Sequence, residues 1–233
     1  MIYISLFLVV FALATGIIYS ITSYNEFLNA YEEYDNEFTY ANLTGLEFAK
    51  LAISKLGLKT RVVIVKKKLS ECYIPSKDEV HISEYTANKN SLSSITVVAH
   101  ELGHAIQNKN GSKLLTVEAI ISNLSRISLI FLPFEVIFGI VFLFFQNLLI
   151  YSIILFAIVF ISIILSFVLK VAMIPVEREA SNLAIDFLTK YHFISGEEIQ
   201  KSRMLLRKAL GTYVGGVFAP IAKFLKSVLK SFS

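Results

Sequence analysis

Three observations predict a mainly α-helical membrane protein that also carries a small α+β domain. Of the 233 residues, 55% are hydrophobic, and the mean hydropathy of +0.64 is too high for an ordinary soluble domain. Three apolar runs are long enough to cross a hydrocarbon core about 30 Å thick. Most of the 18 acidic residues lie instead in residues 22–124, so we expect this segment to face water and to form the α+β domain.

The apolar runs predict one anchor and one hairpin. Residues 1–21 contain no charge, and without basic leading residues or a small-x-small cleavage site they favour a retained transmembrane anchor over a cleaved signal peptide. The runs 127–145 and 148–169 are separated by two polar residues, which predicts a transmembrane hairpin over 125–174. All 22 basic residues fall on one side of these crossings, so a multi-pass protein of the cell membrane with a cytoplasmic catalytic side is expected.

The charged segment 22–124 begins with helix and strand patterns. Residues 43–56 place apolar side chains among charged ones, which predicts an amphipathic helix that ends at the glycine after it. Residues 61–66 read as a buried strand and 79–83 as a half-buried strand, and 69–77 between them read as a loop or turn. We therefore expect a short antiparallel sheet.

The stretch Ala99–Gln107 contains the motif HExxH on a predicted helix. One helical turn advances about 5.4 Å, so His100 and His104 share one face and can reach the same metal ion. A catalytic zinc takes three protein ligands and leaves a fourth position for water, whose proton Glu101 can accept as the water attacks a peptide carbonyl. The alternatives are a pair of core histidines or a degenerate site, because HExxH also arises by chance.

A third metal ligand is expected beyond the hairpin, where Pro175–Ser181 is the first acidic stretch. Proline can open a helix, which would make Glu177 and Ser181 neighbours on one helical face. Further along, 182–191 predicts continued helix and Ser195 marks a new helix start.

These motifs resemble those of a known family. His-Glu-x-x-His, followed after a hairpin by Pro-Val-Glu-x-x-Ala-Ser, resembles the small prokaryotic membrane proteins called neutral zinc metallopeptidase family 2, or YugP-like proteins. The resemblance extends over Leu43-Thr44-Gly45, Tyr73-x-Pro75, Val80-x-Ile82-Ser83, Ala99–Gln107 and Thr212-Tyr213-Val214. More distantly the chain is similar to the clan of the CAAX prenyl proteases and heat-shock membrane proteases, whose second motif is Glu-x-x-x-Asp.

The resemblance implies a zincin-like domain of the gluzincin type with the HExxH helix packed on its sheet. It implies that Glu177 is the third zinc ligand. Ser181 then stands where the wider clan has aspartate and is expected to support a ligand without binding the ion. That departure from the pattern weakens the role of Ser181 and leaves the role of Glu177 intact.

Other residues are weaker candidates for the site. Tyr213 or His192 could donate a hydrogen bond to the oxyanion, although a tyrosine in such an apolar context more often serves packing. Val80, His81 and Ile82 are expected to bind an extended substrate along an edge strand, with His81 on the polar face and not a metal ligand.

One acidic residue, Glu135, interrupts the first arm of the predicted hairpin two residues after Pro133. An ionisable group at that depth is costly unless it is paired or wet. Two interpretations stay open: Glu135 lines a route from the bilayer to the zinc, or the proline bends the chain and Glu135 lies near the interface.

Four segments are therefore expected: an anchor (1–21), a zincin-like catalytic domain (22–124), a transmembrane hairpin (125–174) and a last segment (175–233). This last segment holds the third-ligand helix and, from Pro220, a basic amphipathic helix that would lie at the membrane interface.

The expected function is zinc-dependent endopeptidase activity on polypeptides near the cytoplasmic membrane face, through a zinc-bound water that Glu101 activates. One Zn²⁺ per chain, a peptide or membrane-protein substrate and a lipid bilayer are the expected partners, with no nucleic acid. Two alternatives remain: an intramembrane site-2-type protease, and a catalytically dead scaffold that keeps zinc for structure.

Overall fold

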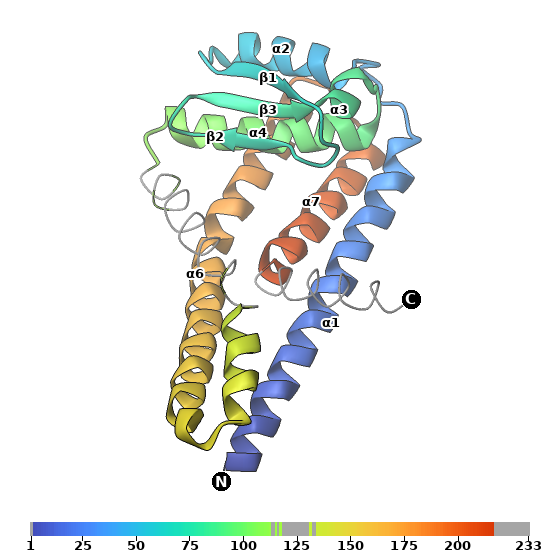
Figure 1. Cartoon of the computed structure of the whole chain (residues 1–233). Coiled ribbons are helices and arrows are strands. Elements are labelled where there is room, and N and C mark those ends of the chain that lie inside the picture. Colours follow the sequence, from blue (N-terminus) through green and yellow to red (C-terminus); the bar gives the residue numbers. More distant parts are fainter. Residues whose placement is uncertain (1, 113–114, 116, 118–130, 132–133, 217–233) are drawn as a thin grey trace. The chain divides into compact units, whose positions relative to one another are not determined.

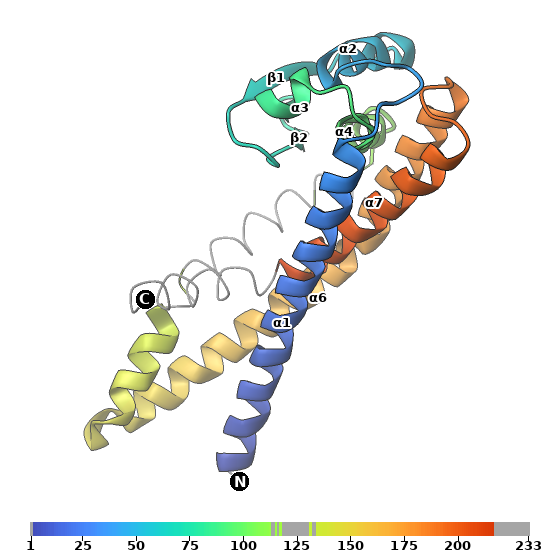
Figure 2. The same cartoon turned by 90° about the vertical axis from the view of Figure 1, so that its right-hand side faces the viewer.

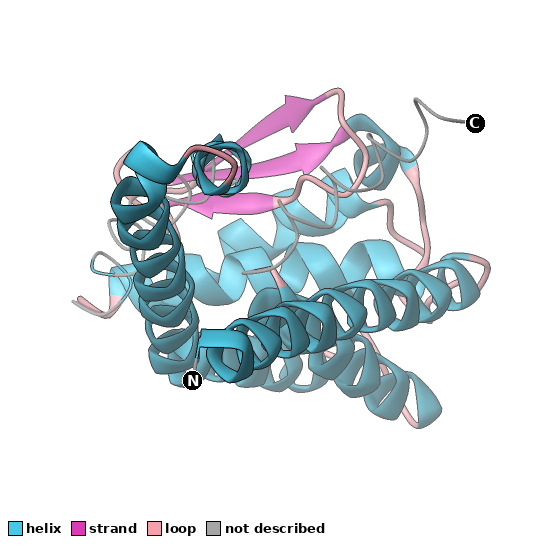
Figure 3. Cartoon of the chain, turned by 60° about the horizontal axis from the view of Figure 1, so that its bottom comes forward, coloured by secondary structure: helices cyan, strands magenta, loops and turns pink. Residues whose placement is uncertain are grey.

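The computed structural model describes residues 2–112, 115, 117, 131 and 134–216 (Figure 1). The described elements are α1 (Ile2–Asp35), α2 (Gly45–Leu56), β1 (Arg61–Val65), β2 (Cys72–Ile74), β3 (Glu79–Ser83), α3 (Glu84–Asn88), α4 (Leu92–Lys109), the short 3-10 helix η1 (Gln146–Leu148), α6 (Leu149–Lys190) and α7 (Glu197–Gly215). In Figure 3 the strands form one small sheet, and the other described residues are helices and loops. The predicted mainly helical chain with a small sheet is therefore observed.

The structure overturns the prediction that the chain crosses a membrane. None of the helices in the described part of the chain combines the length and the apolar content that a crossing requires. For the described residues this finding contradicts the predicted anchor, the predicted transmembrane hairpin and the predicted integral-membrane location, and the cytoplasmic assignment that depended on them loses its basis. Residues 125–130 and 132–133 of the predicted hairpin lie outside the described residues. The predicted crossings rested on uninterrupted apolar runs in the sequence. In the structure these runs are parts of longer helices, which continue to Asp35 in α1 and to Lys190 in α6.

The chain divides into two compact units, each made of separate stretches of sequence. Unit 1 comprises residues 1–25, 120–173 and 211–233, and unit 2 comprises residues 26–119 and 174–210. The long helices α1 and α6 each contribute one part to each unit.

Unit 1 contains the apolar stretches. Within it, the hydroxyl of Ser152 donates to the carbonyl of Gly139 at 2.6 Å, and the Lys170 ammonium lies 4.4 Å from the centroid of the Tyr213 ring. The carboxyl oxygen Oε2 of Glu135 is buried and has no hydrogen-bond partner among the described residues. Pro133 and the predicted amphipathic helix from Pro220 lie outside the described residues.

Unit 2 contains the sheet, whose strand order is β1-β3-β2. β1 runs parallel to β3 with Arg61 opposite Glu79, whereas β2 runs antiparallel to β3 with Tyr73 opposite Val80. The sheet is therefore mixed, and the predicted antiparallel sheet is corrected. The segment predicted as a loop forms β2, which reverses the chain direction between β1 and β3 and pairs with the outer side of β3. For the same reason β3 is the central strand, and the prediction that it is an edge strand is wrong.

Helices α2 and α4 contact each other and the sheet, and α3 lies beside β1 and β3 (Figures 1 and 2). α2 begins at Thr44, whose hydroxyl accepts from the Glu47 amide while the Glu47 carboxylate accepts from the Thr44 amide. It ends at Gly57, whose φ of 58° lies in the left-handed region. α4 begins after Ser91, whose hydroxyl accepts from the Ser94 amide. The predicted helix over 43–56 and the predicted helix that carries the motif are therefore confirmed.

The core of unit 2 lies between these helices, β3 and the parts of α6 and α7 that belong to the unit. Its largest fully buried side chains are Tyr31, Phe48, Ile82, Leu92, Ile95, Leu102, Ile185, Leu188, Ile194 and Leu205. The rings of Phe48 and Phe193 meet edge to face with centroids 5.0 Å apart. Burial of these apolar groups fixes α4 against α6.

Helix α6 differs from the prediction at Pro175. The proline was expected to open a new helix, but it lies inside α6, so the preceding apolar run and the segment with Glu177 are one continuous helix. The predicted continuation over 182–191 is confirmed to Lys190, and the predicted new helix begins at Glu197 as α7.

Candidate metal centre

Helix α4 presents the two motif histidines on one face, as their spacing predicts. The rings of His100 and His104 have centroids 4.9 Å apart and meet at 78°. Both are largely buried, with side-chain exposures of 16% and 8%. The two imidazoles are thus held by the helix and by its packing, and little of either reaches solvent.

A close approach of α4 and α6 brings the third candidate to these histidines. A Cβ atom added to Gly103 would lie 2.3 Å from the carbonyl oxygen of Ala180, a distance that real Cβ atoms do not show. The glycine between the two motif histidines therefore permits a helix crossing that a larger residue would obstruct. This crossing sets Glu177, one turn before Ala180, beside the histidine pair.

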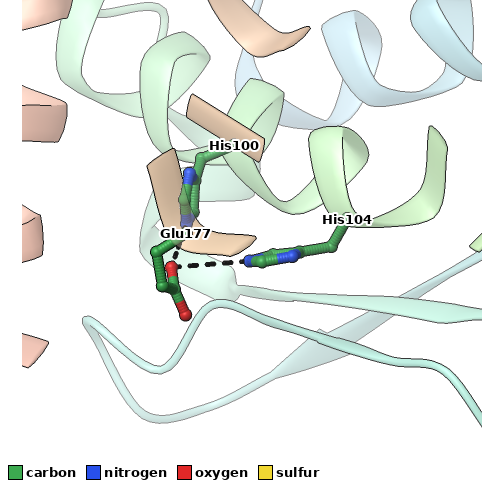
Figure 4. A group of neighbouring side chains, drawn as sticks. All are labelled: His100, His104 and Glu177. Carbon is green, nitrogen blue, oxygen red and sulfur yellow. Dashed lines mark ion pairs between the residues drawn. The ribbon is translucent and has the colours of Figure 1, made fainter. Parts of the chain in front are cut away.

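Figure 4 shows the three side chains pointing toward one another. The Glu177 carboxyl oxygen Oε2 lies 3.3 Å from His100 Nε2 and 3.6 Å from His104 Nε2. One ligand atom from each residue lies within 4.8 Å of the others. The trio can therefore hold a metal ion, and it is the one such group found in the described part of the chain.

The pKa values of Glu177 and Glu101 are shifted in opposite directions at the site. Burial would raise the pKa of Glu177, but the neighbouring imidazoles of His100 and His104 outweigh it and lower the pKa below its usual range. For Glu101 burial is the largest effect and raises the pKa, although the nearby histidines oppose it. Part of Glu101 is still accessible to solvent. Glu177 is thus held as an anion, as a ligand must be, whereas Glu101 is closer to exchanging a proton.

Hydrogen bonds support each histidine from the side opposite Glu177. His100 Nδ1 lies 3.3 Å from the Ser181 hydroxyl, which donates to the Glu177 carbonyl at 2.9 Å. His104 Nδ1 lies 2.9 Å from Gln107 Oε1. The structure therefore places Ser181 beside His100, and its role in supporting a ligand stays a prediction.

Sequence reasoning missed the contact of Gln107. The available signal was its position three residues after His104 on the same helix, which places the two side chains on neighbouring positions of one face. Glutamine carries no charge and has no part in the HExxH pattern, so the spacing alone gave no reason to select it.

Three other candidates lie elsewhere. His81 lies on the central strand β3, where its Nε2 is 3.1 Å from the Glu79 carboxylate, and its predicted place on the polar face is confirmed. Its neighbours Val80 and Ile82 are fully buried in the core. Because β3 pairs on both sides, these residues do not offer the free edge that their predicted substrate-binding role assumed.

The two predicted oxyanion donors lie on other parts of the chain. His192 follows the end of α6, and at about 1.5 Å per helical residue it is on the order of 20 Å beyond Glu177. Tyr213 belongs to unit 1, beside Lys170, whereas the trio belongs to unit 2. A catalytic role for either residue stays a prediction.

The sequence is similar to known proteins over nearly its whole length. The profile of a family described as "Putative neutral zinc metallopeptidase" matches residues 7–231. A protein of Bacillus subtilis (strain 168) named "Putative membrane protease YugP" is 28% identical to the chain over 201 residues, which cover 85% of each protein. No solved structure is significantly similar to the chain.

Proposed function

The chain belongs to the neutral zinc metallopeptidase family, and on that premise we propose that it is a zinc-dependent endopeptidase whose ion is held by His100, His104 and Glu177. The membership confirms the resemblance that the sequence indicated. The observation that carries the proposal is the convergence of two imidazoles and one carboxylate, from α4 and α6, within 4.8 Å of one another.

The donor set suits zinc. Two neutral imidazole nitrogens and one carboxylate oxygen are the ligands of a known class of catalytic zinc sites, in which three protein ligands leave one position open. Both histidines have a hydrogen-bond partner at Nδ1, as ligating histidines almost always do. A bound zinc ion would supply Lewis-acid chemistry, because it polarises a carbonyl and lowers the pKa of a water molecule toward neutrality.

Glu101 is proposed as the general base. It follows His100 directly on α4, it is absent from the trio, and burial raises the pKa of its carboxyl. A carboxyl oxygen of Glu101 takes the proton from the attacking water and then gives it to the leaving nitrogen of the cleaved peptide. His100, His104 and Glu177 orient the reacting groups and change no protonation state in this scheme.

The substrate is proposed to be an extended segment of polypeptide. β2 is at the edge of the sheet and pairs only with β3 among the described strands, and it contacts α4. A peptide can add to such an edge as a further strand, with main-chain hydrogen bonds that ignore side-chain identity. An unfolded segment has a free backbone for such pairing, whereas most backbone groups of a folded protein are already hydrogen-bonded.

The proposal is tested on the purified chain with one unfolded protein and the same protein in its folded state. We expect about one zinc per chain, cleavage of the unfolded form, loss of cleavage when a chelator removes the zinc, and recovery when zinc is added back. Cleavage that persists in the zinc-free protein would contradict the proposal. Bound zinc without any cleavage would favour a catalytically dead scaffold.

A further inference from the structure

We propose that Gln107 is a positioning residue that fixes the His104 ring and joins the two helices carrying the zinc ligands. The inference rests on the proposed function, because it concerns the same three ligands. Gln107 is only 1% exposed and lies on α4, three residues after His104.

The carboxamide of Gln107 makes three hydrogen bonds, one to its own helix and two to α6. Its Nε2 donates to the Val176 carbonyl at 3.0 Å and to the Glu179 carboxylate at 2.8 Å. Its Oε1 lies 2.9 Å from His104 Nδ1. A single buried side chain thus connects the residues on either side of Glu177 with one of the two histidines.

These partners determine which way the amide points. A carbonyl oxygen can only accept hydrogen bonds, so the atom that faces Val176 must be the nitrogen, and the same nitrogen donates to Glu179. The amide oxygen must then face His104, and because that oxygen can only accept, Nδ1 of His104 must carry the hydrogen. In the neutral ring this leaves the lone pair on Nε2, the atom that lies 3.6 Å from Glu177.

Ser181 favours the same tautomer of His100, with the hydrogen on Nδ1, but through a longer hydrogen bond. Its hydroxyl donates to the carbonyl of Glu177 and therefore accepts from His100 Nδ1, at a longer 3.3 Å. That hydrogen bond joins His100 to α6 through one hydroxyl. Gln107 joins α4 to α6 through two hydrogen bonds and is buried, so its loss leaves several polar groups without partners.

The contact also gives Glu179 a role other than that of a ligand. Glu179 is two residues from Glu177 and would be the next carboxylate to consider for the ion. Its oxygen is instead engaged by Gln107, so we assign Glu179 to the support of Gln107.

The test compares Gln107→Met with Gln200→Met, which changes an exposed glutamine on α7 in the same way. Methionine keeps the length of the side chain and removes all three hydrogen bonds. Zinc affinity, measured by competition with a chelator, is expected to fall about 10- to 100-fold in Gln107→Met and to stay unchanged in Gln200→Met. The visible absorption of the cobalt-loaded protein should change in Gln107→Met only, because the His104 ring is no longer held.

An exchange of the two side chains separates positioning from packing. Gln107→Glu places a second carboxylate against Glu179 and should weaken zinc binding. Adding Glu179→Gln restores an amide donor between the two positions. We expect the double variant to bind zinc at least about threefold more tightly than Gln107→Glu alone. A merely structural role would show no such recovery, and the exchange decides the question if Gln107→Met does not fold.

Two results would overturn the inference: zinc affinity of Gln107→Met within about threefold of the unchanged chain, or a double variant no better than Gln107→Glu alone. Both are distinct from failure of the proposed function, which would appear as absence of zinc from the unchanged chain.

Discussion

The two ends of α4 are held by different chemistry. At its first turn the Asp35 carboxylate accepts hydrogen bonds from Ser91 at 2.9 Å, Ser93 at 3.0 Å and the hydroxyl of Tyr85. The half that carries the histidines faces α6 through the close approach of Gly103 and through the amide of Gln107, which donates to the Val176 carbonyl and the Glu179 carboxylate. One end is thus fixed by several hydroxyl groups around one carboxylate, and the other by a close helix contact and one buried amide beside the candidate metal centre.

The difference indicates how folding and function are divided along one helix. An anion near the N-terminus of a helix is favourable, because the unpaired amides there carry partial positive charge. Asp35 is 7% exposed and is not part of the trio, so its contribution should be to stability. The other half must present imidazoles to an ion, so its contacts with α6 should act on the position of these imidazoles.

The largest effect is expected from removing a ligand at the histidine end. His100→Ala, His104→Ala and Glu177→Ala should each lose most of the bound zinc and the activity with it, because two remaining ligands hold the ion weakly. Metal content of the purified variants measures this, with Glu197→Ala, which changes an exposed glutamate on α7, as the control that keeps zinc. Unchanged zinc in Glu177→Ala would assign the third ligand to Glu179 instead.

Asp35→Ala should lower the stability of the fold and leave zinc binding nearly unchanged. It leaves three hydroxyl donors without their acceptor and should lower the free energy of unfolding by about 2–4 kcal/mol. Zinc affinity of the folded variant should stay within about twofold. Denaturant unfolding of the metal-free protein, together with chelator competition, measures both. A fall in zinc affinity at unchanged stability would show that the two ends of α4 are not separate in function.

Gly103→Ala should lower both the stability of the fold and the affinity for zinc, because it forces α4 and α6 apart. The added Cβ would meet backbone atoms of Ala180, which cannot move as a side-chain end can. We expect a loss of about 1–3 kcal/mol in the free energy of unfolding and weaker zinc binding. Wild-type values for both quantities would mean that the crossing is not as close as the structure shows.

The smallest effect is a dependence of stability on pH at the Asp35 end. Burial would raise the pKa of Asp35, but hydrogen bonds from Tyr85, Ser91 and Ser93, together with Lys89, lower it below the ordinary value of 3.8. The carboxylate therefore stabilises the fold at neutral pH, and this contribution is lost as the pH falls below about 4. The difference in unfolding free energy between the unchanged chain and Asp35→Asn should shrink there. A difference that is constant from pH 7 to pH 3 would contradict this.

Local sequence rules predicted the elements that local interactions determine. The helix with the motif and the helix end at Gly57 follow from spacing and from residues that stop helices, and the pairing of His100 with His104 follows from helical geometry. Glu177 came from the family resemblance, and the structure brings it to the histidines.

The errors concern properties set by contacts distant in sequence. A three-residue strand such as Cys72–Ile74 has too few residues for an alternating pattern, and the central place of β3 depends on which strand pairs with it. Pro175 satisfied a local rule for a helix start, yet it lies inside α6. The contacts of Gln107 and Asp35 join segments far apart in the chain, and no spacing in the sequence reports them.

The central claim is that the histidine end of α4 performs catalysis, and Glu101→Gln tests it most directly. Glutamine keeps the size and shape of the side chain and removes the proton acceptor. We predict that the variant keeps its zinc, measured as metal per chain, while cleavage of an unfolded protein falls by at least about 10²-fold. Loss of zinc, or cleavage at the rate of the unchanged chain, would contradict the account.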